Sequence, residues 1–244
     1  MKRESKMFTR KLSKQAKLMM LFVFVPLYFF CGSIIATALI KFCVIQFSLV
    51  IDETTAVAYL NLILDSIYAI IILCIFKDSL KEQFQDFLKD KKENLLYGCV
   101  IGFVMLFTAG IIGGLISMSF GAQSDSQNQI LIENLAIAHP IIIVITSVIL
   151  APIVEELLFR STLFGWLYEV HPIVAHFGSA FLFGFVHVMD AILSGNYQEW
   201  TQIFAYFLMG GVLSFIYEKR NNIYVPILSH MMNNLISILL VLFG

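Results

Sequence analysis

The sequence predicts an all-α protein, a polytopic transmembrane bundle of about seven to eight helices. Of its 244 residues, 59% are hydrophobic, and the mean hydropathy is +0.85. These apolar residues gather into runs of about twenty or more, the length that an α-helix needs to cross a bilayer. A soluble domain of this size has a lower apolar share and shorter apolar runs, so a soluble fold is excluded.

Each apolar run predicts one membrane helix. In chain order the predicted helices are roughly 18–50, 54–76, 95–118, 136–167, 172–190, 200–217 and 223–243. The first and the fourth run are longer than thirty residues. We therefore expect these two helices to tilt, protrude or break, and an eighth, re-entrant piece would fit the pattern.

Basic residues lie at alternate connections between the predicted helices. Fourteen of the sixteen Lys and Arg precede residue 18, lie between Lys77 and Lys92, or are Lys219 and Arg220. The intervening connections, near Asp52, at 120–134 and at 191–199, contain none. The positive-inside rule therefore places the amino terminus in the cytoplasm and the carboxyl terminus outside.

The chain divides into three predicted parts. Residues 1–17 form a basic cytoplasmic segment, and residues 18–134 hold the amino-terminal membrane helices. Within this second part, residues 77–93 alternate five Lys with five acids around apolar positions, which predicts an amphipathic connector on the cytoplasmic face. Residues 135–244 carry the polar side chains that predict a catalytic core.

Glycines in the third predicted helix recur at a spacing of four. Gly98 and Gly102 form one such pair, and Gly110 and Gly114 form another. Small residues at this spacing let another helix approach closely, so packing is the predicted role of both pairs. The four cysteines are scattered singly, which indicates neither a disulfide nor a metal site.

Three ionisable residues interrupt the fourth apolar run. Glu155 and Glu156 are adjacent, and Arg160 follows one helical turn later. Each such group costs roughly 2.5 to 3.5 kcal/mol at bilayer depth, so a functional reason is expected. Glu156 and Arg160 share a helix face and predict an ion pair. Glu155 points about 100° away without a cation of its own, which makes it a candidate general base.

Later helices add His187, His230 and Asn234. Glu155 lies sixteen residues before the predicted turn at His171, and His187 lies sixteen after it. Equal distances from the turn of an antiparallel hairpin bring two residues to the same depth. His230 and Asn234 are four apart on one face of the last helix, so three helices direct polar side chains to one level. Taken singly, His230 or Asn234 also fits a simple interhelical hydrogen bond.

These residues resemble the motifs of a known family. Glu155-Glu156-x-x-x-Arg160, Phe183-x-x-x-His187 and His230-x-x-x-Asn234, in this order, are similar to the three motifs of the CPBP intramembrane proteases. That family includes type II CAAX prenyl endopeptidases and bacterial bacteriocin-processing and Abi proteins. The resemblance covers roughly residues 136–240. The first half of the chain resembles the family only in being hydrophobic.

The resemblance implies an intramembrane endopeptidase. Glu155, assisted by His187, would activate water; His230 and Asn234 would stabilise the oxyanion; Glu156 and Arg160 would support the site. The implied partners are the lipid bilayer and a hydrophobic or membrane-associated peptide substrate, with no nucleic acid. The implied location is a cell membrane, crossed several times, and the compact loops favour a bacterial plasma membrane.

Alternatives remain open at this point. Glu155, His187 and His230 could instead bind a divalent metal such as zinc, because two His and one carboxylate are a known zinc set. We favour a mechanism without a cofactor, since Asn234 suits an oxyanion donor better, and the chain contains no H-E-x-x-H. A non-enzymatic membrane immunity or scaffold protein of the same fold is a second reading. A proton-coupled transporter is a third, but it predicts internal symmetry that the sequence lacks.

Overall fold

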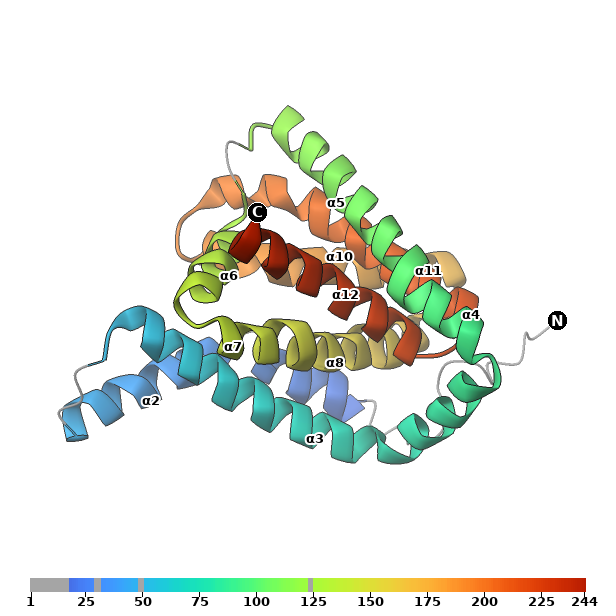
Figure 1. Cartoon of the computed structure of the whole chain (residues 1–244), viewed down its shortest axis with the longest axis horizontal. Coiled ribbons are helices and arrows are strands. Elements are labelled where there is room, and N and C mark those ends of the chain that lie inside the picture. Colours follow the sequence, from blue (N-terminus) through green and yellow to red (C-terminus); the bar gives the residue numbers. More distant parts are fainter. Residues whose placement is uncertain (1–17, 29–31, 48–50, 123–124) are drawn as a thin grey trace.

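The computed structural model describes residues 18–28, 32–47, 51–122 and 125–244, and these residues contain helices and no strand (Figure 1). The predicted all-α class is therefore confirmed. Six helices of the described residues are long and apolar enough to cross a membrane. They are Glu53–Lys89, Lys91–Ser119, Pro140–Tyr168, Pro172–Leu193, Tyr197–Arg220 and Tyr224–Phe243.

Several spans are made of elements that join end to end, because short π-helical turns interrupt the α-helices. In chain order the elements are η1 (Met20–Phe24), α2 (Gly32–Phe47), α3 (Glu53–Lys89), α4 (Lys91–Leu95), η3 (Leu96–Ile101), α5 (Gly102–Ser119), α6 (Gln127–Ala138), α7 (Pro140–Ile143), η4 (Val144–Leu150), α8 (Ala151–Glu156), η5 (Leu157–Phe164), α9 (Gly165–Tyr168), α10 (Pro172–Leu193), η6 (Tyr197–Gln202), α11 (Ile203–Arg220) and α12 (Tyr224–Phe243). The span that carries the two adjacent glutamates thus runs from α7 through α9.

Two of the predicted segments have clearly different boundaries in the structure. The connector predicted at 77–93 continues the second span, since α3 runs unbroken to Lys89 without a Gly or Pro to end it. The predicted helix 136–167 starts instead at Pro140, and α6 ends at Ala138. Pro140 disfavours a helical conformation in the preceding residue, His139, which has φ −138° and ψ 62°. The described parts of the first apolar run are η1 and α2, and residues 29–31 and 48–50 lie outside the description.

The start of α3 is tied to the break before α7. Asp52 caps α3 by accepting hydrogen bonds from the backbone N–H of Thr55 at 2.9 Å and from its hydroxyl at 2.6 Å. These bonds lower the pKa of the exposed Asp52 carboxyl from its ordinary value. The Thr55 hydroxyl also lies 2.9 Å from Nε2 of His139, so one cluster joins two helix ends.

The helices of the carboxyl half pack around α11 and α12. α11 contacts α10 on one side and α5 on the other, while α12 packs against η3, α5 and η4. Figure 1 shows α12 between α5 and the span that contains α7 and α8. α3 lies along η4 and α8 on the far side of that span. This arrangement places the site-bearing faces of α8, α10 and α12 toward a common interior.

The glycine pairs of the third span have different environments. A Cβ on Gly102 would collide with Ser229, and one on Gly98 would lie 2.9 Å from Cβ of Leu228, so this pair packs against α12 as predicted. The same prediction is wrong for the other pair. A Cβ on Gly110 would meet only the Met209 sulfur at 3.9 Å, and Gly114 has nothing within 4 Å.

Candidate active site

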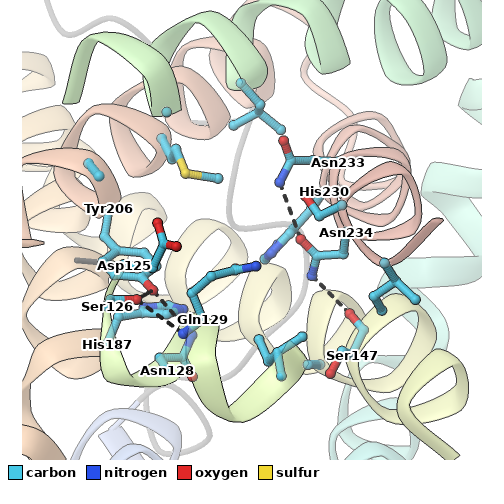
Figure 2. Close-up of a pocket in the computed structure, with 18 of the residues that line it drawn as sticks. Asp125, Ser126, Asn128, Gln129, Ser147, His187, Tyr206, His230, Asn233 and Asn234 are labelled. Atoms are coloured by element: carbon cyan, nitrogen blue, oxygen red, sulfur yellow. Dashed lines mark hydrogen bonds between the residues drawn. The ribbon is translucent and has the colours of Figure 1, made fainter. Parts of the chain in front are cut away.

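A cavity of about 500 Å³ lies among α3, α5, α6, η4, α8, α10, α11 and α12. Its lining includes Glu155, His187, His230 and Asn234, the four residues for which the sequence predicts a catalytic role. Figure 2 shows three of them, His187, His230 and Asn234, directed toward the same space from two sides. The structure therefore brings together the residues that the three motifs supply.

Glu155 and His187 face each other across the cavity. Glu155 is 9% exposed, and its Oε2 atom has no hydrogen-bond partner. His187 Nε2 lies 3.9 Å from that oxygen. The other ring nitrogen, Nδ1, lies 2.7 Å from the carbonyl oxygen of Phe183, which can only accept, so Nδ1 carries the hydrogen.

When the His187 ring is neutral, Nε2 presents its lone pair to Glu155. A carboxylate oxygen is also an acceptor, and 3.9 Å is too long for a direct hydrogen bond. A water molecule is the simplest group that could donate one hydrogen to each acceptor. The pair could thus bind a water molecule between its two acceptor atoms.

Glu156 is the centre of a fully buried charged network. Its Oε2 lies 3.1 Å from Nε of Arg160, so the predicted ion pair is present, although this N–H is not aligned for a hydrogen bond. Nη2 of Arg160 donates to the carbonyl oxygen of Gly210 at 3.1 Å, and the guanidinium lies 4.7 Å from the ring centroid of Phe183. These contacts hold a charge that burial would otherwise make costly.

The structure also reveals a partner that the sequence did not predict. Nδ1 of His230 lies 3.0 Å from Oε1 of Glu156. A carboxylate that is paired with Arg160 accepts, so Nδ1 of His230 donates its hydrogen here. The remaining ring nitrogen, Nε2, is the one available to the cavity that His230 lines.

Asn234 is oriented by a backbone carbonyl. Its Nδ2 donates to the oxygen of Ser147 at 2.8 Å, and its Oδ1 lies 3.4 Å from Nδ2 of Asn233 (Figure 2). Because the carbonyl can only accept, the amide group must present its nitrogen to Ser147. The second hydrogen of Nδ2 has no protein acceptor among these contacts.

Ser147 has a free carbonyl because of a local irregularity in its span. In η4 the N–H of Ala151 bonds to the carbonyl of Thr146, five residues back. The next residue in that register is Pro152, which has no N–H to give to Ser147. The proline thus leaves a carbonyl that Asn234 uses.

The sequence did not predict Tyr206 and Ser126, two residues that line the cavity beside His187. Tyr206 of α11 stacks on the His187 ring, with centroids 4.5 Å apart and planes at 21°. Its hydroxyl lies 2.5 Å from the hydroxyl of Ser126, which caps α6 by accepting from the N–H of Gln129. The pattern Ser126-x-x-Gln129 is a capping signal that could have predicted the start of α6. No sequence signal identifies Tyr206.

The metal-binding alternative has a geometric requirement that the described residues do not meet. No group of three or more His, Cys, Asp or Glu among residues 18–28, 32–47, 51–122 and 125–244 is arranged to hold a metal ion. Glu155, His187 and His230 are thus not placed as a ligand set, and Nδ1 of His230 is bonded to Glu156. We derive no step through a metal.

Comparison with known proteins indicates the same family as the three motifs do. Residues 137–236 match the family model described as type II CAAX prenyl endopeptidase Rce1-like. No solved structure matches significantly. The matched segment contains the three motifs and all four cavity residues named above.

Three bacterial proteins are similar to the chain. The protein named putative membrane peptidase YdiL of Bacillus subtilis is 30% identical over 167 residues, which cover 68% of this chain and 64% of that protein. The membrane-embedded CAAX protease MroQ of Staphylococcus aureus is 28% identical over 195 residues, or 75% of this chain and 74% of its own length. The UPF0177 protein YvdC of Lactococcus lactis is 27% identical over 143 residues, or 59% and 52%.

The match to YdiL spans less than two thirds of that protein's length. The name of YdiL nevertheless describes the same kind of protein, a membrane peptidase, as the family model and the name of MroQ do. Residues 137–236 of this multi-pass membrane chain are thus similar to the CPBP family of intramembrane proteases.

Proposed function

We propose that this protein is an endopeptidase that hydrolyses a peptide bond of a hydrophobic or membrane-associated peptide within a bacterial plasma membrane. The observation that carries the proposal is the buried, unpartnered Oε2 of Glu155, 3.9 Å from Nε2 of His187 inside a cavity. Buried carboxylates with a structural role are normally paired, as Glu156 is. An unpaired acceptor opposite a second acceptor suits a bound, reactive water.

In the proposed reaction, Glu155 takes a proton from this water as the water oxygen attacks the carbonyl carbon of the peptide. His187 accepts a hydrogen bond at Nε2 from the second O–H of the water, which stays on the attacking oxygen, and so orients the nucleophile. When the C–N bond breaks, Glu155 gives its proton to the leaving amine, which restores the carboxylate. Water and peptide are thus converted to a carboxylic acid and an amine without another reactant.

The oxyanion of the tetrahedral intermediate would be stabilised by Asn234 and His230. Asn234 has one amide hydrogen beyond the bond to Ser147. His230 can donate from Nε2 only when both ring nitrogens are protonated, since Nδ1 is bonded to Glu156.

The test compares peptides released by cells that produce the intact protein with those from cells that produce Glu155→Gln at equal levels. We expect at least one peptide that depends on Glu155. If the two peptide sets and every associated phenotype are identical, the non-enzymatic scaffold is the better explanation. The peptide so identified supplies the substrate for the measurements below.

We further propose that the reaction requires no metal. Purified protein treated exhaustively with EDTA and 1,10-phenanthroline is expected to keep its cleavage rate on the identified peptide. A loss that one added divalent ion restores would contradict this proposal. The measurement separates the glutamate-dependent mechanism from the metal-dependent alternative.

Pro152→Ala is expected to lower turnover by roughly tenfold or more, approaching the 10²- to 10³-fold cost of losing an oxyanion donor. The new N–H at position 152 can bond to the carbonyl that now holds Asn234. The kcat should fall with little change in KM, and Pro152→Ala should add little to the loss in an Asn234→Ala background. Pro226→Ala, in the first turn of α12, is the control. Additive losses would contradict a role through Asn234.

A further inference from the structure

The cavity is built from one end of the bundle. α5 contributes its later residues, such as Gly110 and Gly114, and α10 contributes Phe183 and His187 from its second half. α12 lines the cavity from His230 onward, whereas the span that begins at Tyr197 lines it from Gln202 to Met209, close to its start. Given the directions of these helices, all of these cavity-lining residues lie toward the same end of the bundle, where α6 also lies.

The basic residues gather at the opposite end. Lys89 ends α3, and Lys219 and Arg220 lie in the last turn of α11. Arg220 joins the two basic connections directly, because Nη1 lies 2.7 Å from Glu93 and Nε donates to Asn94 at 2.9 Å. Figure 1 shows α4 at one side of the bundle and α6 at the other.

The connections at the cavity end contain acids and no Lys or Arg. Residues 120–134 include Asp125 and Glu133, and residues 190–202 include Asp190 and Glu199. Lys and Arg in short connections set the orientation of a membrane protein, with the basic ends in the cytoplasm. Of the nine Lys and Arg that the structure describes, seven lie between Lys77 and Lys92 or are Lys219 and Arg220.

We propose that the cavity is loaded from the non-cytoplasmic face and acts on peptide segments that have already crossed the membrane. Glu155 lies near the middle of the span Pro140–Tyr168, and the cavity connects it with α6 and Asp125 at the outer end. That the bound peptide is cleaved rests on the proposed peptidase function, whereas the side from which the cavity is reached does not depend on it. A translocation or membrane-insertion step must therefore precede cleavage.

Cysteine labelling in intact cells tests the orientation. In a chain whose four cysteines are replaced by Ala, single variants Asp125→Cys and Gln198→Cys mark the cavity end, and Lys92→Cys marks the basic end. All three positions are exposed. A membrane-impermeant maleimide added to intact cells should label the first two variants, and should label Lys92→Cys only after the membrane is permeabilised.

Each other pattern overturns the proposal. Labelling of Lys92→Cys alone in intact cells would reverse the orientation, and labelling at both ends would mean that the protein inserts in two directions. Failure to label Asp125→Cys and Gln198→Cys before permeabilisation would also contradict outer access. If labelling is as expected while the Glu155→Gln comparison finds no dependent peptide, the peptidase function fails and the orientation stands.

A second observation points to the side chain that the cavity accepts. Gly110 and Gly114 face the cavity with almost no protein neighbours, beside the apolar Leu106 and Ile111 of the same helix. Glu155, whose Oε2 atom has no hydrogen-bond partner, lines this same space. We propose that the α5 wall at Gly110 and Gly114 seats a bulky apolar side chain of the substrate next to the bond that is cut.

Gly114→Leu tests this subsite, because the added side chain would occupy the open space. We expect a loss in kcat/KM on the order of tenfold or more for a substrate with Leu or Phe next to the cut, and a smaller loss for its Ala-substituted form. Gly211→Leu is the matched control, since Gly211 also has nothing within 4 Å but does not line the cavity. Equal losses for both substrates, or for both glycine variants, would overturn the subsite.

Discussion

Replacing Glu155 by Gln is expected to lower the kcat of peptide cleavage by 10²- to 10⁴-fold, the range for a positioned general base. Gln has nearly the same shape, but its amide cannot take a proton from water at neutral pH. Its NH₂ group can also donate directly to Nε2 of His187, which would fill the space proposed for the water. The change therefore removes the base and displaces the nucleophile together.

The measurement uses purified protein in lipid vesicles and the peptide found by the cell comparison. Glu53→Gln, an exposed change at the start of α3, is the control and should keep both kcat and KM. The thermal midpoint of Glu155→Gln should equal or exceed that of the intact protein, because a buried carboxylate oxygen without a hydrogen-bond partner is removed. Turnover above one tenth of the original rate would contradict the role of Glu155.

Two contacts of the site were predictable from the sequence, because each depends only on the number of residues that separate its partners along the chain. Glu155 and His187 are equally far from the turn at His171, and the structure brings them to 3.9 Å. Glu156 and Arg160 meet because they are one turn apart, even though the helix becomes π-helical at Leu157. Local geometry was sufficient in both cases.

Other contacts depend on how whole helices are rotated against one another, which spacing does not determine. The bond between His230 and Glu156 requires a particular face of α12 to meet α8. The stacking of Tyr206 on His187 requires the same of α11 and α10. Gly110 and Gly114 mark a bare helix face, but spacing cannot say whether a helix or a cavity covers it.

The role of Pro152 lies between these two cases. The proline is visible in the sequence, and its missing N–H predicts one unpaired carbonyl in the preceding turn. Which carbonyl is freed depends on the π-helical register of η4, and the partner depends on the position of α12. The sequence therefore predicts that a carbonyl is left unpaired, and tertiary packing determines which carbonyl it is and which side chain bonds to it.

Arg160→Leu is expected to lower the free energy of unfolding by about 3 to 5 kcal/mol, the cost of breaking a buried ion pair by removing one partner. The guanidinium is fully buried and contacts Glu156, Gly210 and the ring of Phe183. Its loss leaves the carboxylate of Glu156 with the hydrogen bond from His230 and no cationic partner of its own. Equilibrium unfolding in mixed detergent micelles measures the change.

Lys89→Leu is the matched control, because Lys89 pairs with Asp86 at 2.7 Å on the surface, with side chains 73% and 38% exposed. A surface pair contributes about 0 to 1 kcal/mol, so little change is expected there. The double variant Glu156→Leu/Arg160→Leu should regain most of the lost stability, since it buries no unpaired charge. Its activity should nevertheless stay low, because His230 no longer has the carboxylate that orients its ring. A stable and fully active double variant would show that the charged network serves neither folding nor the proposed oxyanion site.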